Sequence, residues 1–342
     1  MHTSLAVKYR PMKFEDVVEQ SITTKILQKV IESGKPKNAY LFAGDSGTGK
    51  TTLARIFANG VNNGVGEPIE IDAASNNGVN QVRAIVESAN ERALVGTYKI
   101  FIIDECHAIT SDGWRAFLKG IEEPSPYTIY IFCTTEPNKV PATILNRVQR
   151  YNFSKISNAG IKGRLMDICR AEGFTNYEDT CELISKISQG CMRDAITCLD
   201  QCADYSTDLS LENTKQILGE VDVETMLRLT NAVYNGDEAK VLTILDRLYN
   251  GGHDLKQFIS AYLDFIIDLT KYSIFRDIRL TAIPAYLESV QDQDINVTYT
   301  AGISLDWLNG FMDHILKLKT EIKYDTSYKA TTEVYLLKAC RG

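Results

Sequence analysis

The sequence predicts an α/β domain built on a parallel sheet, followed by a small helical domain and a longer helical bundle. Three observations predict this order. Short β-branched and aromatic runs alternate with helical patterns over residues 36–155, strand-like runs stop after Phe153, and a glycine-rich turn separates the first strand from the next helix. We therefore expect domains over residues 1–155, 156–219 and 220–342.

Strands and helices are expected to alternate in the first domain. Strands are predicted where apolar runs are bounded by glycine, proline or polar residues, over 39–44, 69–72, 99–105 and 127–135. Helices are predicted between them, over 50–61, 79–93 and 111–123. Because this order builds βαβ units, we expect helices on both faces of a parallel sheet.

The rest of the chain is predicted to be helical. Short amphipathic patterns occupy the second domain over 160–173, 178–188 and 190–205. Longer patterns in the third domain cover 223–234, 238–249, 254–276, 305–319 and about 327–340, with a stop signal at Gly251 and Gly252.

Composition excludes several classes of protein. No apolar run of about 18 residues is present and the N-terminus lacks the pattern of a signal peptide, so we expect a soluble, cytoplasmic protein. The eight cysteines form no paired framework, which favours reduced thiols. Cys191, Cys198 and Cys202 have helical spacing without a CxxC pair, so we interpret them as core residues rather than zinc ligands.

The charge is unevenly distributed along the chain. Residues 1–155 carry 18 Lys+Arg and 16 Asp+Glu, whereas residues 156–342 carry 19 and 28. A polyanionic partner is therefore expected to contact the first domain. The excess is too small to indicate nucleic acid by itself.

The strongest motif is GDSGTGKT at 44–51, which matches GxxxxGK[ST] between a predicted strand and a predicted helix. Its glycines allow successive backbone N–H groups to surround a polyphosphate, and the helix N-terminus adds partial positive charge. We expect Lys50 to contact the β- and γ-phosphates and the Thr51 hydroxyl to bind Mg²⁺.

A second motif, KIFIIDECHAI, places Asp104 and Glu105 at the carboxyl end of a buried strand, where ligands bind in open α/β sheets. We expect Asp104 to hold Mg²⁺ through water, and Glu105 to orient and polarise the attacking water. The letters DECH also occur in helicases, but the repeated arginine motifs of those enzymes are not found. His107 is interpreted as packing or polar lining.

Thr134 and Thr135 end the next predicted strand. They are expected beside the γ-phosphate if this strand neighbours the P-loop strand, and are otherwise ordinary strand residues. Arg193 opens a helix of the second domain, where it either reaches a phosphate across the domain junction or is a solvated helix charge. Arg147 and Arg150 follow the strand without a carboxylate close in sequence.

Together these motifs resemble the ATPase subunit of a DNA polymerase clamp loader, of the bacterial gamma/tau type within the AAA+ class. The resemblance covers 1–220 closely and the rest only as a helical bundle of fitting length. The stretches that carry it are KYRPMKFEDVVEQ (8–20), AYLFAGDSGTGKTTLAR (39–55), IEIDAASNNGVNQVR (69–83), KIFIIDECHAI (99–109), FLKGIEEP (117–124), CTTEPNKVPATILNR (133–147) and GCMRDAITCLDQ (190–201).

The resemblance implies ATP and Mg²⁺ as cofactors, and it implies a role for each matching residue. Thr51 and Asp104 hold the metal, Asp104 and Glu105 form the Walker B pair, and Thr135 and Arg193 occupy the sensor 1 and sensor 2 positions. The helix opening at Ser75, Asn76 and Asn77 resembles the one that tracks the DNA backbone, a suitable place for contact without base reading. The implied nucleotide-binding residues are Tyr9, Arg10, Pro11, Val17, Val18, Gly44, Asp45, Ser46, Gly47, Thr48, Gly49, Lys50, Thr51, Thr52 and Arg193.

Arg147 lies in Asn146-Arg147-Val148, where the family has Ser-Arg-Cys. The resemblance makes it an arginine finger for the ATP site of a neighbouring subunit, since a guanidinium is permanently charged and grips phosphate oxygens. The alternative is a surface arginine that pairs with Glu136 or with a helix end. Arg150 is interpreted as a solvated or structural charge.

The implied function is that of a clamp-loader subunit. ATP-bound subunits, several of them copies of this chain, form a five-membered hetero-oligomer with other clamp-loader subunits and open a sliding clamp; primer–template DNA then triggers hydrolysis and clamp release. A subunit that acts mainly as a scaffold and a homo-oligomeric DNA motor of the same class are the alternatives.

Two departures from the family pattern shape these expectations. Residues 58–68 close the gap where the family inserts a four-cysteine module, so no zinc is expected, and the short form also leads us to expect no long tail after the bundle. This short form favours a phage or a divergent bacterium as the source.

Overall fold

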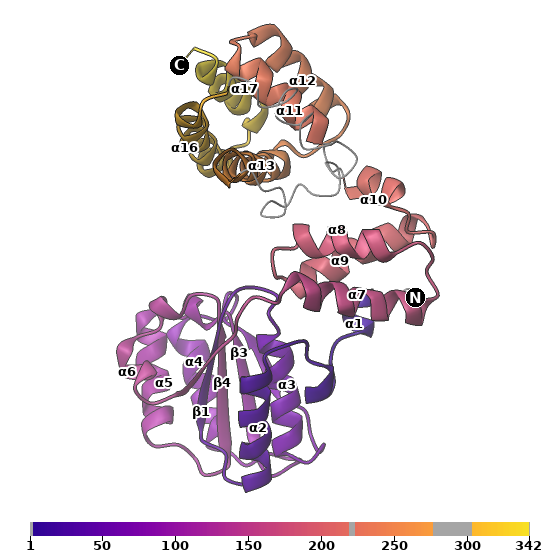
Figure 1. The fold of residues 1–342 in the computed structure, drawn as a ribbon. Coiled ribbons are helices and arrows are strands. Elements are labelled where there is room, and N and C mark those ends of the chain that lie inside the picture. The colour runs from indigo at the N-terminus through magenta and orange to yellow at the C-terminus, as the bar shows by residue number, and fades with distance from the viewer. Residues whose placement is uncertain (1–2, 219–222, 276–302, 342) are drawn as a thin grey trace. The chain divides into compact units, whose positions relative to one another are not determined.

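The computed structural model describes residues 3–218, 223–275 and 303–341. It divides into two compact units, Met1–Leu211 and Glu212–Gly342, which are considered separately (Figure 1). The predicted boundary at 219/220 falls on residues 219–222, outside the described residues, and the three-domain division stays a prediction.

The first unit contains a parallel sheet of five strands in the order β2-β3-β4-β1-β5. Four strands match the predicted ones, and β5 was not predicted. It is short and mostly polar, but it pairs with β1 at the sheet edge, where Tyr151 packs its ring against Phe42. The strands are β1 (Ala39–Ala43), β2 (Ile69–Asp72), β3 (Lys99–Asp104), β4 (Thr128–Thr134) and β5 (Gln149–Asn152).

Helices cover both faces of this sheet, as predicted (Figure 1). On one face, α2 (Ser21–Ser33) and α3 (Lys50–Val61) pack on Tyr40, Phe42 and their neighbours. On the other face, the sheet packs against α4 (Val79–Ala89), α5 (Ser111–Glu122) and α6 (Ala142–Leu145). The remaining short elements here are α1 (Leu5–Lys8), η1 (Phe14–Asp16), η2 (Cys106–Ala108) and η3 (Pro137–Lys139).

The strand order fixes where chemistry is possible. Strand β4 lies between β3 and β1, and Ala43 at the end of β1 is in register with Thr134 at the end of β4. Since all these strands are parallel, the loops after β1, β3 and β4 meet at one edge of the sheet. The change of direction at β1 is a topological switch point, the usual ligand site of such sheets.

Three helices of the first unit follow the sheet: α7 (Asn158–Glu172), α8 (Glu178–Ile187) and α9 (Met192–Tyr205). The segment that leads into α7 is held by hydrogen bonds from two residues that precede α2. Gln20 donates its side-chain amide to the Ser154 carbonyl at 2.7 Å, and Glu19 accepts from the Ser157 backbone at 3.1 Å. Glu19 and Gln20 both have left-handed backbones, with φ of 58° and 52°. Their side chains contact residues 154–157, which join β5 to α7.

The second unit is helical, as predicted. Its described helices are α11 (Val223–Tyr234), α12 (Glu238–Asn250), α13 (Leu255–Phe275), α16 (Leu305–Ile322) and α17 (Tyr328–Ala339), and α10 (Leu211–Leu218) begins at the last residue of the first unit. Helices α11, α12, α13, α16 and α17 share one apolar core, within which the hydroxyls of Thr230 and Tyr262 form a 2.8 Å hydrogen bond. Within the described part of the chain, no helix is long and apolar enough to cross a membrane.

Candidate active site

The loop after β1 forms a cradle that depends on glycine. Gly47 and Gly49 have φ of 66° and 98°, a region that favours glycine. Lys50 is only 6 % exposed, and its ammonium donates to the carbonyls of Gly44 and Asp45, each at 2.8 Å. Burial lowers the pKa of Lys50, and the two backbone carbonyls are the hydrogen-bond acceptors of its side-chain nitrogen.

The other predicted loop residues complete this cradle. Asp45 and Ser46 are exposed at its tip, whereas Thr48 is buried and donates its hydroxyl to the Asp45 carbonyl at 2.8 Å. Thr52 is half-buried on the first turn of α3. A hydrogen bond within the loop therefore supports its conformation, and the tip of the loop is exposed to solvent.

Thr51 and Asp104 bring two oxygen ligands together from distant parts of the sequence. The Thr51 hydroxyl donates to Oδ2 of Asp104 at 2.8 Å, and the other carboxylate oxygen accepts from the Glu105 backbone N–H at 3.0 Å. A hydroxyl and a carboxylate beside a phosphate cradle are the ligand types that Mg²⁺ uses in nucleotide sites. The residues present therefore fit the predicted metal.

Glu105 lies at the same edge of the sheet as Thr51 and Asp104. Its backbone has φ of 47°, uncommon for a residue with a side chain, and its Oε2 lies 3.3 Å from the Thr135 hydroxyl and 3.3 Å from Nδ1 of His107. The expectation that the threonine strand neighbours the P-loop strand is confirmed. Thr135 contacts Glu105, whereas Thr134 is fully buried and accepts from the Glu136 N–H at 2.9 Å.

The start of α9 lies directly against the cradle. The Met192 N–H donates to the Gly47 carbonyl at 3.2 Å, and a methyl group at Gly47 would come within 2.1 Å of the Cys191 sulfur. Arg193 follows, and its charge lowers the pKa of the buried Lys50 further. The structure thus brings the predicted sensor 2 arginine close to the P-loop; its role is still a prediction.

Cations gather around this loop. Burial lowers the pKa of Arg10, and the positive charges of Arg55 and Arg193 lower it further. Arg55 was missed by the sequence analysis, although it stands four residues after Thr51, one turn along α3. It pairs with Glu70 at 2.5 Å, and its buried Nε has no hydrogen-bond partner. Such a concentration of positive charge favours a polyphosphate ligand.

The resemblance implies that Tyr9, Arg10, Pro11, Val17 and Val18 frame the adenine and ribose of the nucleotide, and these residues lie on the segment that joins α1 to α2. The Tyr9 hydroxyl donates to Glu172 at the end of α7, and its carbonyl accepts from Arg164 at 2.9 Å. Val17 packs against the apolar core between the sheet and helices α2 and α3, and Val18 lies against Gly160 on α7. Pro11, which lies between Tyr9 and Val17 in the sequence, is half-buried. Contact of this segment with the base stays a prediction.

The predicted DNA-contacting residues lie in the turn before α4. Ser75 and Asn76 are exposed, and Asn76 donates its side chain to the Asp72 carbonyl at 3.0 Å. The Asn77 carbonyl accepts from the backbone and hydroxyl of Thr110, the residue that caps α5, at 3.2 and 3.1 Å. The turn is therefore held in place while its polar tip faces solvent.

Arg147 does have a carboxylate partner, which the sequence did not indicate. Its Nη2 lies 2.7 Å from Oε1 of Glu122 at the end of α5, and its Nη1 donates to the Thr143 carbonyl at 2.8 Å. The partner is thus not Glu136, which pairs with Lys139 at 2.9 Å. Both members of the Arg147 pair are exposed. Arg150 lies on β5 and donates to Asn152 at 2.9 Å.

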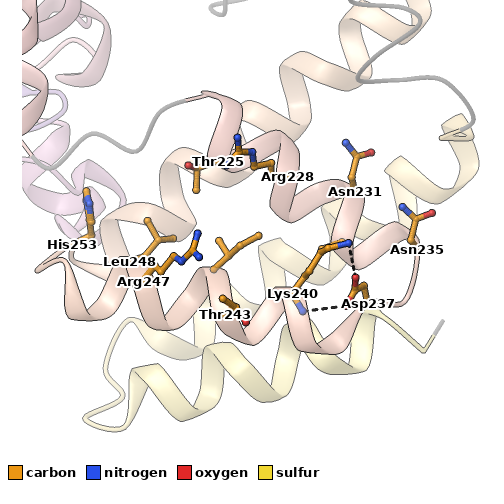
Figure 2. Close-up of a pocket in the computed structure, with 12 residues that line it drawn as sticks. Thr225, Arg228, Asn231, Asn235, Asp237, Lys240, Thr243, Arg247, Leu248 and His253 are labelled. Carbon is orange, nitrogen blue, oxygen red and sulfur yellow. Dashed lines mark hydrogen bonds and ion pairs between the residues drawn. The ribbon is translucent and has the colours of Figure 1, made fainter.

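The second unit contains a groove of about 690 Å³ between α11 and α12 (Figure 2). Most of its lining residues are polar, and two of its cations have local partners: Arg228 pairs with Glu224, and Lys240 pairs with Asp237 at 2.8 Å. It contains neither a P-loop nor a pair of acids, so the catalytic candidates lie in the first unit. Among the described residues, no cluster of three His, Cys, Asp or Glu side chains could hold a metal ion.

The first unit has the features that define an AAA+ domain. They are a P-loop, an acid pair at the end of β3, a strand that ends in threonine between these two, and an adjacent helical segment. A helical collar follows this domain. Solved structures agree on the fold. The RuvB Holliday junction branch migration motor of Thermotoga maritima matches 66 % of this chain and 79 % of its own, with a TM-score of 0.54. At 19 % identity, this likeness establishes the fold alone.

Family models and curated relatives define the particular family. Residues 67–157 match a model of the DNA polymerase III delta subunit, and residues 209–342 match domain III of DNA polymerase III subunits gamma and tau. The chain is 34 % identical to subunit tau of Bacillus subtilis over 97 % of its length, and 33 % identical to subunit gamma/tau of Mycoplasma genitalium over 82 %. It is a gamma/tau-like protein of the DNA polymerase III family. It spans 62 % and 51 % of the lengths of these two relatives.

Proposed function

We propose that this chain is the ATP-hydrolysing subunit of a sliding-clamp loader in DNA replication. ATP binding by several copies, assembled with other clamp-loader subunits, opens the clamp, and primer–template DNA triggers hydrolysis and clamp release. The single observation that carries the proposal is the meeting of Lys50, Thr51, Asp104 and Glu105 at one sheet edge, in a chain whose C-terminal part matches gamma and tau domain III.

Each of these residues has a proposed task. Lys50 holds the β- and γ-phosphates, while Thr51 and Asp104 hold Mg²⁺, which neutralises charge on the phosphates when bound. Glu105 accepts a hydrogen bond from the attacking water and directs it at the γ-phosphorus. Thr135, directly after β4, and Arg193, on α9, approach the same phosphate. A scaffold subunit has no need of this complete set.

DNA contact is proposed at Ser75, Asn76 and Asn77. The turn is exposed, polar and followed by the N-terminus of α4, and it offers donors and partial charge to a phosphate. Such contacts position the duplex and do not read its sequence. The collar would hold the ring together.

The test is reconstitution with the clamp, primed DNA and the other clamp-loader subunits of the same source. Native mass spectrometry should give a five-membered mixed assembly, and ATPase activity should rise when clamp and primed DNA are both added. Lys50→Ala is the matched inactive control. Assembly into a homohexamer without other subunits would favour a DNA motor, and equal loading by wild type and Lys50→Ala would favour a scaffold.

A further inference from the structure

His107 lies between two carboxylates beside the active site. It sits on η2, immediately after β3, and its ring is 19 % exposed. Nδ1 lies 3.3 Å from Oε2 of Glu105 and 3.2 Å from the Thr134 hydroxyl, and Nε2 lies 3.4 Å from Oε1 of Glu136. Both ring nitrogens therefore face polar partners, which plain packing of an aromatic ring does not require.

We propose that His107 is a positioning residue that fixes the carboxylate of Glu105 for hydrolysis. The inference rests on the proposed function, because it assigns His107 a task only if Glu105 directs the attacking water. It replaces the interpretation of His107 as polar lining. His107 itself is not proposed to contact the nucleotide.

The need for such a residue follows from the surroundings of Glu105. Its side chain is 40 % exposed, and the structure gives Oε2 two polar neighbours, Thr135 and His107. A glutamate has three rotatable bonds, and water competes for an exposed carboxylate. With His107 removed, the 3.3 Å contact to Thr135 is left to hold Oε2 alone. A displacement of about 1 Å in a reacting group can cost about 10²-fold in rate.

His107 is itself held from its other side. Glu136, which faces Nε2, pairs with Lys139 at 2.9 Å and donates its backbone N–H to the Thr134 hydroxyl at 2.9 Å. Thr134 in turn contacts Nδ1 of His107. The ring is thus fixed between the end of β3 and the loop after β4, so its orientation does not depend on Glu105 alone.

The test compares His107→Ala with His107→Gln in the reconstituted, DNA-stimulated ATPase. We expect kcat of His107→Ala to fall by about 10- to 100-fold, with KM for ATP changed by less than about 3-fold, since phosphate binding is not touched. His107→Gln keeps a side-chain amide donor and should recover kcat to within about 5-fold of wild type. His253→Ala, in the second unit, is the matched control and should leave kcat unchanged.

A double-variant cycle separates positioning from general stability. In a Glu105→Gln background, His107→Ala should cause no further loss, because the group it positions is already neutralised. An unchanged kcat in His107→Ala, or an equal further loss in the Glu105→Gln background, would overturn the inference. If wild type itself has no ATPase above Lys50→Ala, the proposed function fails and the inference with it. An active wild type with an unaffected His107→Ala overturns the inference alone.

Discussion

The hydroxyl of Thr51 donates a 2.8 Å hydrogen bond to Oδ2 of Asp104 and so joins the first turn of α3 to the end of β3. The two residues are 53 positions apart in the sequence. Their contact brings the two motifs together at one edge of the sheet and places a hydroxyl beside a carboxylate. Mg²⁺ in a nucleotide complex would be held here by the Thr51 hydroxyl and, through water, by Asp104.

The first prediction concerns this pair. Thr51→Ala should weaken Mg²⁺-dependent ATP binding by about 10-fold or more, because it removes the proposed hydroxyl ligand and leaves Oδ2 of Asp104 without its hydrogen-bond donor. Thr51→Ser is the matched control, since it keeps the hydroxyl. Binding of a fluorescent ATP analogue, titrated with Mg²⁺, measures both. Equal Mg²⁺ dependence in Thr51→Ala and wild type would exclude Thr51 as a ligand.

The second prediction separates nucleotide binding from hydrolysis at Glu105. Glu105→Gln should bind ATP and clamp as wild type does but lower kcat by about 10²-fold or more, because an amide cannot polarise the attacking water. Glutamine keeps the shape of the side chain and disturbs neither Thr51 nor Asp104. Single-turnover hydrolysis measured beside equilibrium ATP binding tests both halves. An unchanged steady-state ATPase would show that another group positions the water.

The third prediction concerns the contact of the P-loop with α9. Gly47→Ala should weaken nucleotide binding, since φ of 66° costs alanine about 1 kcal/mol and its methyl group would come within 2.1 Å of the Cys191 sulfur. Cys191→Ala combined with Gly47→Ala removes the sulfur and should recover part of the loss. Isothermal titration with ATP measures both variants. No recovery in the double variant would mean that backbone strain alone accounts for the defect.

The sequence predicted the parallel sheet, the helices on both its faces and the helical second unit, because the apolar periodicity of these elements is strong. It missed β5, whose residues 149–152 are mostly polar and owe their strand geometry to pairing with β1. It also placed Lys50, Thr51, Asp104 and Glu105 in one site. It could not find the Arg147–Glu122 pair, since the fold rather than the sequence brings α5 and α6 together.

The fourth prediction concerns DNA. Binding should be independent of base sequence and should weaken steadily with salt, because residues 1–155 carry a small positive excess and few phosphate contacts are available in each subunit. Fluorescence anisotropy of the assembled complex on two primed duplexes of unrelated sequence, from about 50 to 200 mM salt, measures this. A strong preference for one duplex, or affinity that salt leaves unchanged, would contradict contact through phosphates.

The fifth prediction asks which ATP site Arg147 serves. Its pair with Glu122 at 2.7 Å is exposed, and pairs of this kind are worth about 0–1 kcal/mol, so a stronger anion could displace the carboxylate. The γ-phosphate of a neighbouring subunit is such an anion. Arg147→Ala should therefore leave ATP binding by the isolated chain nearly unchanged and lower ATPase in the assembled ring by about 10³-fold or more, the size of effect known for fingers supplied in trans.

Two further variants make the Arg147 test directional. Glu122→Gln removes the competing charge and should leave ring ATPase intact or raise it, whereas Arg150→Ala alters a β5 arginine and should change little. If Arg147 acts across the interface, then in a ring that mixes wild-type and Arg147→Ala subunits hydrolysis should fail at the wild-type site that faces the variant. Loss of ATP binding by the isolated Arg147→Ala chain would place the arginine at its own nucleotide and refute the assignment.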